Sequence, residues 1–95
     1  MKYNVIVEEH FFEDKIEELK KNDKRIYEVW ESISWELGRD PLGRSRQLMS
    51  DNKHYILETG PLDQDEPGYW ILFRYEKEER KVYLLSIAPV PVQKT

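Results

Sequence analysis

One stretch constrains the fold more than any other: residues 68–89, GYWILFRYEKEERKVYLLSIAP. Two β-favouring runs flank a charged segment at residues 76–81, a pattern that predicts a β-hairpin. No Asn-Gly or Asp-Gly pair marks a tight two-residue turn, so we expect a longer connection. The first run carries large residues on both faces and is the best candidate for the centre of a sheet. The other elements are therefore expected to cover one face of this hairpin.

The segments before the hairpin alternate between strand and helix patterns. Residues 3–8 predict a short strand, and apolar stripes over residues 12–19 and 26–37 predict two helices separated by Asn22 and Asp23, with Gly38 as a stop. Residues 39–52 are expected to form a loop, residues 54–58 a strand, and residues 59–68 an acidic connection. Pro89 and Pro91 should end the last strand.

The predicted order is therefore β-α-α-β-β-β, an α+β fold. The helix hairpin should pack on one face of a four-stranded, mainly antiparallel sheet, because each helix carries only one apolar stripe. The predicted core residues are Val5, Val7, Phe12, Ile16, Leu19, Ile26, Trp30, Ile33, Leu37, Tyr55, Leu57, Ile71, Phe73 and Leu84, with Leu85 as a further candidate.

Length and composition narrow the class of protein. The 95 residues are expected to form a single domain, residues 1–95, with a frayed tail at 89–95. The chain has no cysteine, no apolar run of membrane-spanning length and no signal-peptide pattern, so we expect a cytoplasmic protein without disulfides. The only histidines, His10 and His54, lack nearby ligands at metal-binding spacing. We therefore expect neither a metal nor a cofactor.

The net charge of −4 weighs against a general nucleic-acid binder, although residues 39–57 carry a local charge of +2. Three arginines in that segment are candidates for contacts with phosphate: Arg39, Arg44 and Arg46. A solvated loop is the alternative, and we favour it because charged surface runs are common.

The order of elements and several short motifs resemble the RelE/ParE toxin superfamily of prokaryotic toxin–antitoxin systems. The opening strand YNVIV precedes a charged helix pair, the second helix ends in GRDPLG, and a tyrosine follows the start of the next strand in HYILE. GYWILFRYE is similar to the Gly-Tyr-Arg-hydrophobic strand of the family, and KVYLLSIAP is similar to its closing strand. The resemblance covers nearly the whole chain and implies an antitoxin-like protein as partner.

This sequence departs from the RNA-cleaving branch of that superfamily at the positions that matter for catalysis. Where the branch has basic residues, this chain has Ile56, Glu58, Trp70, Pro89 and Val90, and no tyrosine or histidine follows residue 88. RNA cleavage at a 2′-hydroxyl needs a base, an acid and cations. The resemblance therefore implies a fold without the usual ribonuclease set.

The strand bearing Trp70 suggests where a partner binds. If Ile71 and Phe73 face the helices, Trp70 faces outward, and the candidate partner-binding residues on this open face are Ile56, Glu58, Trp70 and Leu72. We predict a toxin-like module that acts mainly through protein binding, to an antitoxin-like protein or to a second copy. The alternative cover for this face is the chain's own tail.

A second function belongs to a different class. A divergent ribosome-dependent mRNA endonuclease would use Arg74, Lys53 and His54 as catalytic candidates, with Arg44 or Arg46 in support. We rank this enzymatic hypothesis, with binding to RNA or the ribosome, below the protein-binding hypothesis. The reasons are the negative net charge and the missing C-terminal acid–base residue.

Overall fold

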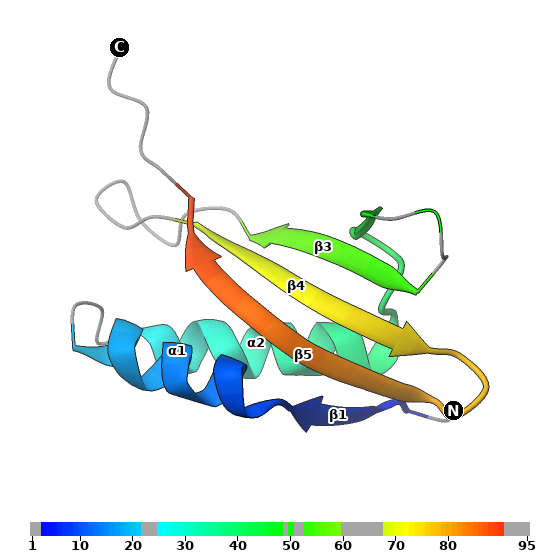
Figure 1. The fold of residues 1–95 in the computed structure, drawn as a ribbon, viewed down its shortest axis with the longest axis horizontal. Helices are drawn as coiled ribbons and strands as arrows, with labels where there is room; N and C mark the ends of the chain where they lie inside the picture. The colour runs from blue at the N-terminus through cyan, green and yellow to red at the C-terminus, as the bar shows by residue number, and fades with distance from the viewer. Residues whose placement is uncertain (1–2, 22–24, 49, 51–52, 60–67, 91–95) are drawn as a thin grey trace, which may run out of the picture.

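The computed structural model describes residues 3–21, 25–48, 50, 53–59 and 68–90. Its elements are β1 (Val5–Glu8), α1 (His10–Lys20), α2 (Ile26–Arg39), β2 (Arg46–Gln47), β3 (His54–Thr59), β4 (Tyr69–Glu76) and β5 (Lys81–Pro89). The α+β class and the predicted order of the main elements are confirmed (Figure 1).

The sheet has five strands, in the order β1-β5-β4-β3-β2, rather than the four predicted. The extra strand, β2, lies inside the predicted loop and pairs antiparallel with β3. Two polar residues are too few to show the alternation that marks a strand, so its formation depends on backbone pairing that the sequence pattern does not encode. Leu48 N extends this pairing with a hydrogen bond to His54 O at 2.8 Å.

β4 pairs antiparallel with both β3 and β5, while β1 pairs parallel with β5. The predicted hairpin is thus the middle of the sheet. Its connection is a turn over Lys77–Arg80, longer than two residues as expected, and Arg80 has a φ of 55°. The β4–β5 register shifts between Leu72 and Phe73, whose partners are Ser86 and Leu84. Leu85 is the extra residue of this bulge.

Both helices pack along one side of the sheet (Figure 1). The predicted stripes bury Phe12 and Ile16 on α1 and four residues of α2 at the expected 3.6-residue period: Ile26, Val29, Ile33 and Leu37. The predicted break at Asn22 and Asp23 lies outside the described residues. α2 runs one residue past Gly38, which is buried and whose carbonyl oxygen accepts a 2.8 Å hydrogen bond from Asn4 N.

The core lies between the helices and the sheet. Its buried residues are Phe12, Ile16, Ile26, Val29, Ile33, Leu37, Leu57, Tyr69, Ile71, Phe73, Val82, Leu84 and Ile87. Leu19, Trp30 and Tyr55 are only partly buried against it.

The prediction that Val5 and Val7 belong to the core is wrong. Val5 is 57% exposed and Val7 is half-buried, while Ile6 between them packs against the core. All three residues are apolar and β-branched, so the sequence does not reveal which face of β1 meets the helices. Leu85 is half-buried because the bulge places it outside the regular alternation.

Candidate functional site

The face of the sheet opposite the helices carries the predicted partner-binding residues. Ile71 and Phe73 are completely buried under the helices, and the alternation along β4 places Trp70 and Leu72 on the other face. The register sets Trp70 opposite Glu58 and Leu72 opposite Ile56. These four residues, called here the open-face patch, therefore form one contiguous surface.

Trp70 is the most exposed apolar member of the open-face patch. Its exposed fraction is 36%, whereas Ile56 and Leu72 are half-buried and Glu58 is exposed. A large indole ring with two aliphatic neighbours is typical of an interface anchor. Arg46 of β2 lies opposite Ile56, which places its guanidinium side chain on the same face.

The three catalytic candidates meet at one end of this face. His54 pairs with Arg74 across β3 and β4, and Lys53 directly precedes His54. Glu76 Oε1 lies 3.4 Å from Arg74 Nε, and its Oε2 lies 3.5 Å from Lys53 Nζ. One carboxylate therefore contacts both cations.

Tyr83 completes this group, the Arg74 cluster (Lys53, His54, Arg74, Glu76 and Tyr83). Arg74 Cζ stands 4.4 Å from the centroid of the Tyr83 ring, the geometry of a cation–π contact. Arg74 Nε is buried and makes no hydrogen bond of good geometry with any described residue, so its approach to Glu76 is a charge contact only. Sequence reasoning missed both Glu76 and Tyr83. Glu76 was detectable because it lies two positions from Arg74 on one strand face, whereas Tyr83 required the strand register.

The three arginines proposed for phosphate contacts do not converge. Arg39 Cζ lies 4.3 Å from the centroid of the Trp35 ring on α2. Arg44 Nε donates to Glu36 Oε2 at 3.0 Å, and this hydrogen bond raises the pKa of Arg44. Arg46 alone joins the open sheet face. Two of the three cations are thus engaged by α2.

No group of three or more His, Asp or Glu side chains that could hold a metal ion occurs within the described ranges. His10 begins α1 with a fully exposed side chain, and its Nδ1 lies 3.8 Å from Glu13 Oε2. In the same described part of the chain, no helix is long and apolar enough to cross a membrane.

The geometry can be compared with known proteins. A crystal structure of the toxin–antitoxin complex RelBE2 from Mycobacterium tuberculosis contains a chain that superposes with a TM-score of 0.74, over 95% of this chain and 94% of that one. The protein therefore has a RelE-like fold. The sequences are 18% identical, so the likeness establishes the RelE-like fold and leaves the site to be argued from its own residues. No family model matches the sequence, and no curated protein resembles it significantly.

Proposed function

We propose that this protein is a cytoplasmic, toxin-like module that acts mainly by binding a protein partner through the open-face patch. The observation that carries the proposal is the exposure of Trp70 beside Leu72 and Ile56 on the face away from both helices. Burying such side chains contributes about 1.5–3 kcal/mol each, which favours a protein that covers them. The RelE-like fold, found in a toxin–antitoxin complex, supports an antitoxin-like partner.

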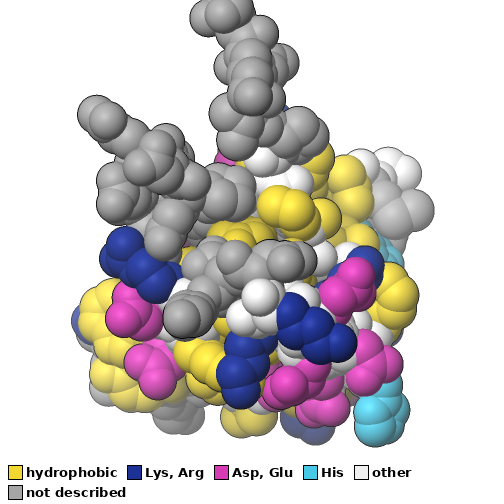
Figure 2. All heavy atoms as spheres, turned by 90° about the vertical axis from the view of Figure 1, so that its left-hand side faces the viewer, with side chains coloured by type: hydrophobic (Ala, Val, Ile, Leu, Met, Phe, Trp, Pro, Cys, Tyr) yellow, Lys and Arg dark blue, Asp and Glu magenta, His cyan; other side chains and the backbone are white. Residues whose placement is uncertain are grey.

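The charge distribution also supports protein binding over RNA binding. At the end of the molecule seen in Figure 2, where β4 begins and β5 ends, acidic and basic side chains lie side by side among exposed hydrophobic ones. Nucleic-acid binding surfaces usually present a continuous basic patch. Within the Arg74 cluster, Glu76 offsets part of the charge of Lys53 and Arg74.

The binding proposal is tested by Trp70→Ala, with Trp35→Ala as the matched control. Trp35 is 65% exposed on α2, so its loss removes a surface indole away from the open face. The partner for this test is to be sought among the products of the neighbouring reading frames, as a protein that co-purifies with this chain. We expect Trp70→Ala to weaken binding by about 2 kcal/mol or more, roughly thirtyfold in Kd, as hot-spot tryptophans do.

Trp35→Ala should leave that Kd within about threefold, a change of well under 1 kcal/mol. Equal Kd values for the wild type and Trp70→Ala would reject the open-face patch as the binding surface. Analytical ultracentrifugation of the chain alone tests whether the partner is a second copy of the same protein. Self-association of the wild type that is lost in Trp70→Ala would identify the partner as another copy.

A ribonuclease is the second candidate function, favoured by the convergence of Lys53, His54, Arg74 and Tyr83 on one side of the sheet. An imidazole, a phenol and two cations are the group types that 2′-hydroxyl chemistry uses. Expression of the chain alone, followed by mapping of messenger ends, tests this candidate. Cleavage that is lost in Arg74→Ala and kept in Arg25→Ala would establish the enzyme and overturn our preference.

A further inference from the structure

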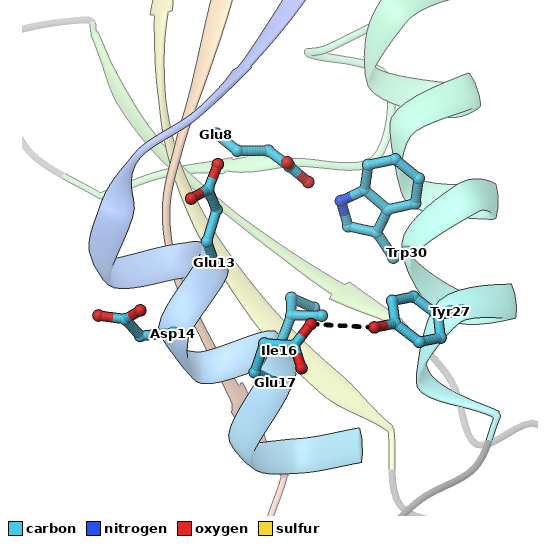
Figure 3. A pocket seen from close by; sticks show the side chains of 7 residues that line it. All are labelled: Glu8, Glu13, Asp14, Ile16, Glu17, Tyr27 and Trp30. Carbon is cyan, nitrogen blue, oxygen red and sulfur yellow. Dashed lines mark hydrogen bonds between the residues drawn. The ribbon is translucent and has the colours of Figure 1, made fainter.

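The helix side of the domain contains a second surface that the proposed function does not use. A hollow of about 410 Å³ opens between β1, α1 and α2 (Figure 3). This acidic groove is lined by Glu8, Glu13, Asp14, Ile16, Glu17, Tyr27 and Trp30. It lies on the opposite side of the sheet from the open-face patch, because Ile16 and Trp30, which line it, pack with the helix-side core.

The lining combines two kinds of group that attract a cation. Four of the seven residues are carboxylates, and no lysine or arginine is among the described residues that line the groove. Two more are aromatic, and the faces of indole and phenol rings attract ammonium and guanidinium groups. The Tyr27 ring already has one cation near it, since Lys20 Nζ lies 4.9 Å from its centroid.

The two aromatic rings of the groove are held in place by contacts with α1 and with the core. Tyr27 Oη donates a 3.0 Å hydrogen bond to Glu17 Oε1, the dashed line in Figure 3, which fixes the phenol against α1. Trp30 packs against the core, and its indole nitrogen points toward the gap between the Glu8 and Glu13 side chains (Figure 3). That nitrogen is buried and has no hydrogen-bond partner among the described residues. The groove is therefore shaped and charged before any ligand arrives.

We propose that the acidic groove is a receptor for a lysine or arginine side chain of a protein partner. The aliphatic stem of such a side chain would lie along Ile16 and the Trp30 ring, while its charged end would meet the carboxylates. A long amphipathic side chain matches a hollow with an apolar floor and an acidic rim. A single partner that filled this groove and the open-face patch would have to pass around the edge of the sheet.

The probe is a set of short peptides, acetyl-Gly-Ser-X-Ser-Gly-amide, in which X is lysine, arginine or norleucine. Norleucine keeps the aliphatic stem and lacks the charge. Binding is followed by the indole N–H signals of the full chain in ¹H–¹⁵N NMR spectra, assigned with Trp→Phe variants. Trp30 reports the groove, while Trp70 reports the open-face patch and Trp35 the rest of the surface.

We expect the Trp30 signal to shift and saturate with the lysine or arginine peptide, while Trp70 and Trp35 stay in place. The norleucine peptide should cause little shift. The double variant Glu13→Gln with Glu17→Gln removes two carboxylates from the groove. It should raise the Kd of the lysine or arginine peptide about fivefold, since exposed charge pairs are individually weak. Glu31→Gln is the matched control, because Glu31 is an exposed carboxylate on α2 outside the groove, and it should not change binding.

Three outcomes would overturn the inference: no shift of Trp30 with either charged peptide, an equal shift with norleucine, or unchanged binding in the Gln variant. A fourth arm uses spermidine. If spermidine saturates the Trp30 signal and neither charged peptide does, the groove takes small polyamines and the assignment to a protein side chain is wrong. Because Trp30 and Trp70 are read separately, failure here leaves the open-face proposal untouched, and the reverse also holds.

Discussion

Arg80 occupies a backbone conformation that glycine adopts at lower cost. Its φ of 55° makes it the only non-glycine residue with a positive φ among those the structure describes. It closes the β4–β5 turn, where Arg80 N donates to Lys77 O at 3.2 Å, and its own carbonyl accepts from Val5 N at 2.8 Å. The left-handed region costs a residue with a Cβ about 1 kcal/mol or more.

We therefore predict that Arg80→Gly stabilises the fold. The gain should be about 0.5–1 kcal/mol, because relief of the left-handed strain is partly offset by the greater freedom of glycine in the unfolded chain. Urea denaturation followed by far-UV circular dichroism measures the change. Lys77→Gly, in the same turn without a positive φ, serves as control and should be neutral or destabilising. A lower midpoint for Arg80→Gly than for the wild type would contradict the strain argument.

Individual residues also show what sequence reasoning can resolve. The outward direction of Trp70 was predicted correctly because Ile71 and Phe73 fix the phase of β4. The face of β1 that meets the helices was predicted wrongly, because Val5, Ile6 and Val7 are all apolar and β-branched. The contact between Tyr83 and Arg74 depends on how β4 and β5 pair beyond the bulge. No pattern within one strand specifies that pairing.

At the scale of the element, β4 carries core residues on one face and candidate binding residues on the other. Its alternate residues face the core and the open side, so two aromatic truncations on one strand should behave differently. Phe73→Ala removes a fully buried ring and should cost about 3–5 kcal/mol of unfolding free energy. Trp70→Ala should cost less than about 1 kcal/mol and leave the monomer folded, because its ring already meets solvent.

Thermal denaturation of the two variants beside the wild type checks this prediction. A fall in melting temperature for Trp70→Ala comparable to that for Phe73→Ala would show that another part of the same chain covers the ring. The predicted tail cover is the first candidate, and residues 91–95 of it lie outside the described residues. Removal of those five residues should then lower the melting temperature in the same way.

The long periodic elements were predictable, and the short or composite ones were not. Both helices and the strands β3, β4 and β5 have apolar periods long enough to identify them, and their order gave the α+β architecture. β2 has only two residues, and the acidic groove is built from β1, α1 and α2 together. A surface made from three separated segments has no signature within any one of them. The open-face patch was predictable because alternation along one strand, β4, identifies its anchor.

At the scale of the whole molecule, β5 joins the first strand to the rest of the sheet. It pairs with β1 on one side and β4 on the other, and it supplies Val82, Leu84 and Ile87 to the core. Burial of three such side chains is worth roughly 5–9 kcal/mol, comparable to the entire stability of a small domain. A chain that ends after Arg80 should therefore show no cooperative unfolding in urea.

The control for that truncation is a chain that ends after Val90, which retains every strand of the described sheet and should unfold cooperatively. The urea denaturation curves of the two truncated chains are recorded under the same conditions. Cooperative unfolding of the chain that ends after Arg80 would mean that the helices and the remaining strands hold the fold without β5.

The position of β5 also sets the timing of folding during translation. The ribosome makes β1 first and β5 last among these strands, yet the two are neighbours in the finished sheet. Contacts between such distant parts of a chain form slowly and only after both are available. A nascent chain therefore cannot assemble its core, or present the open face of a complete sheet, until its final strand has left the ribosome. For a protein proposed to be held by a partner, that delay means the partner can be made and waiting before the surface it binds exists.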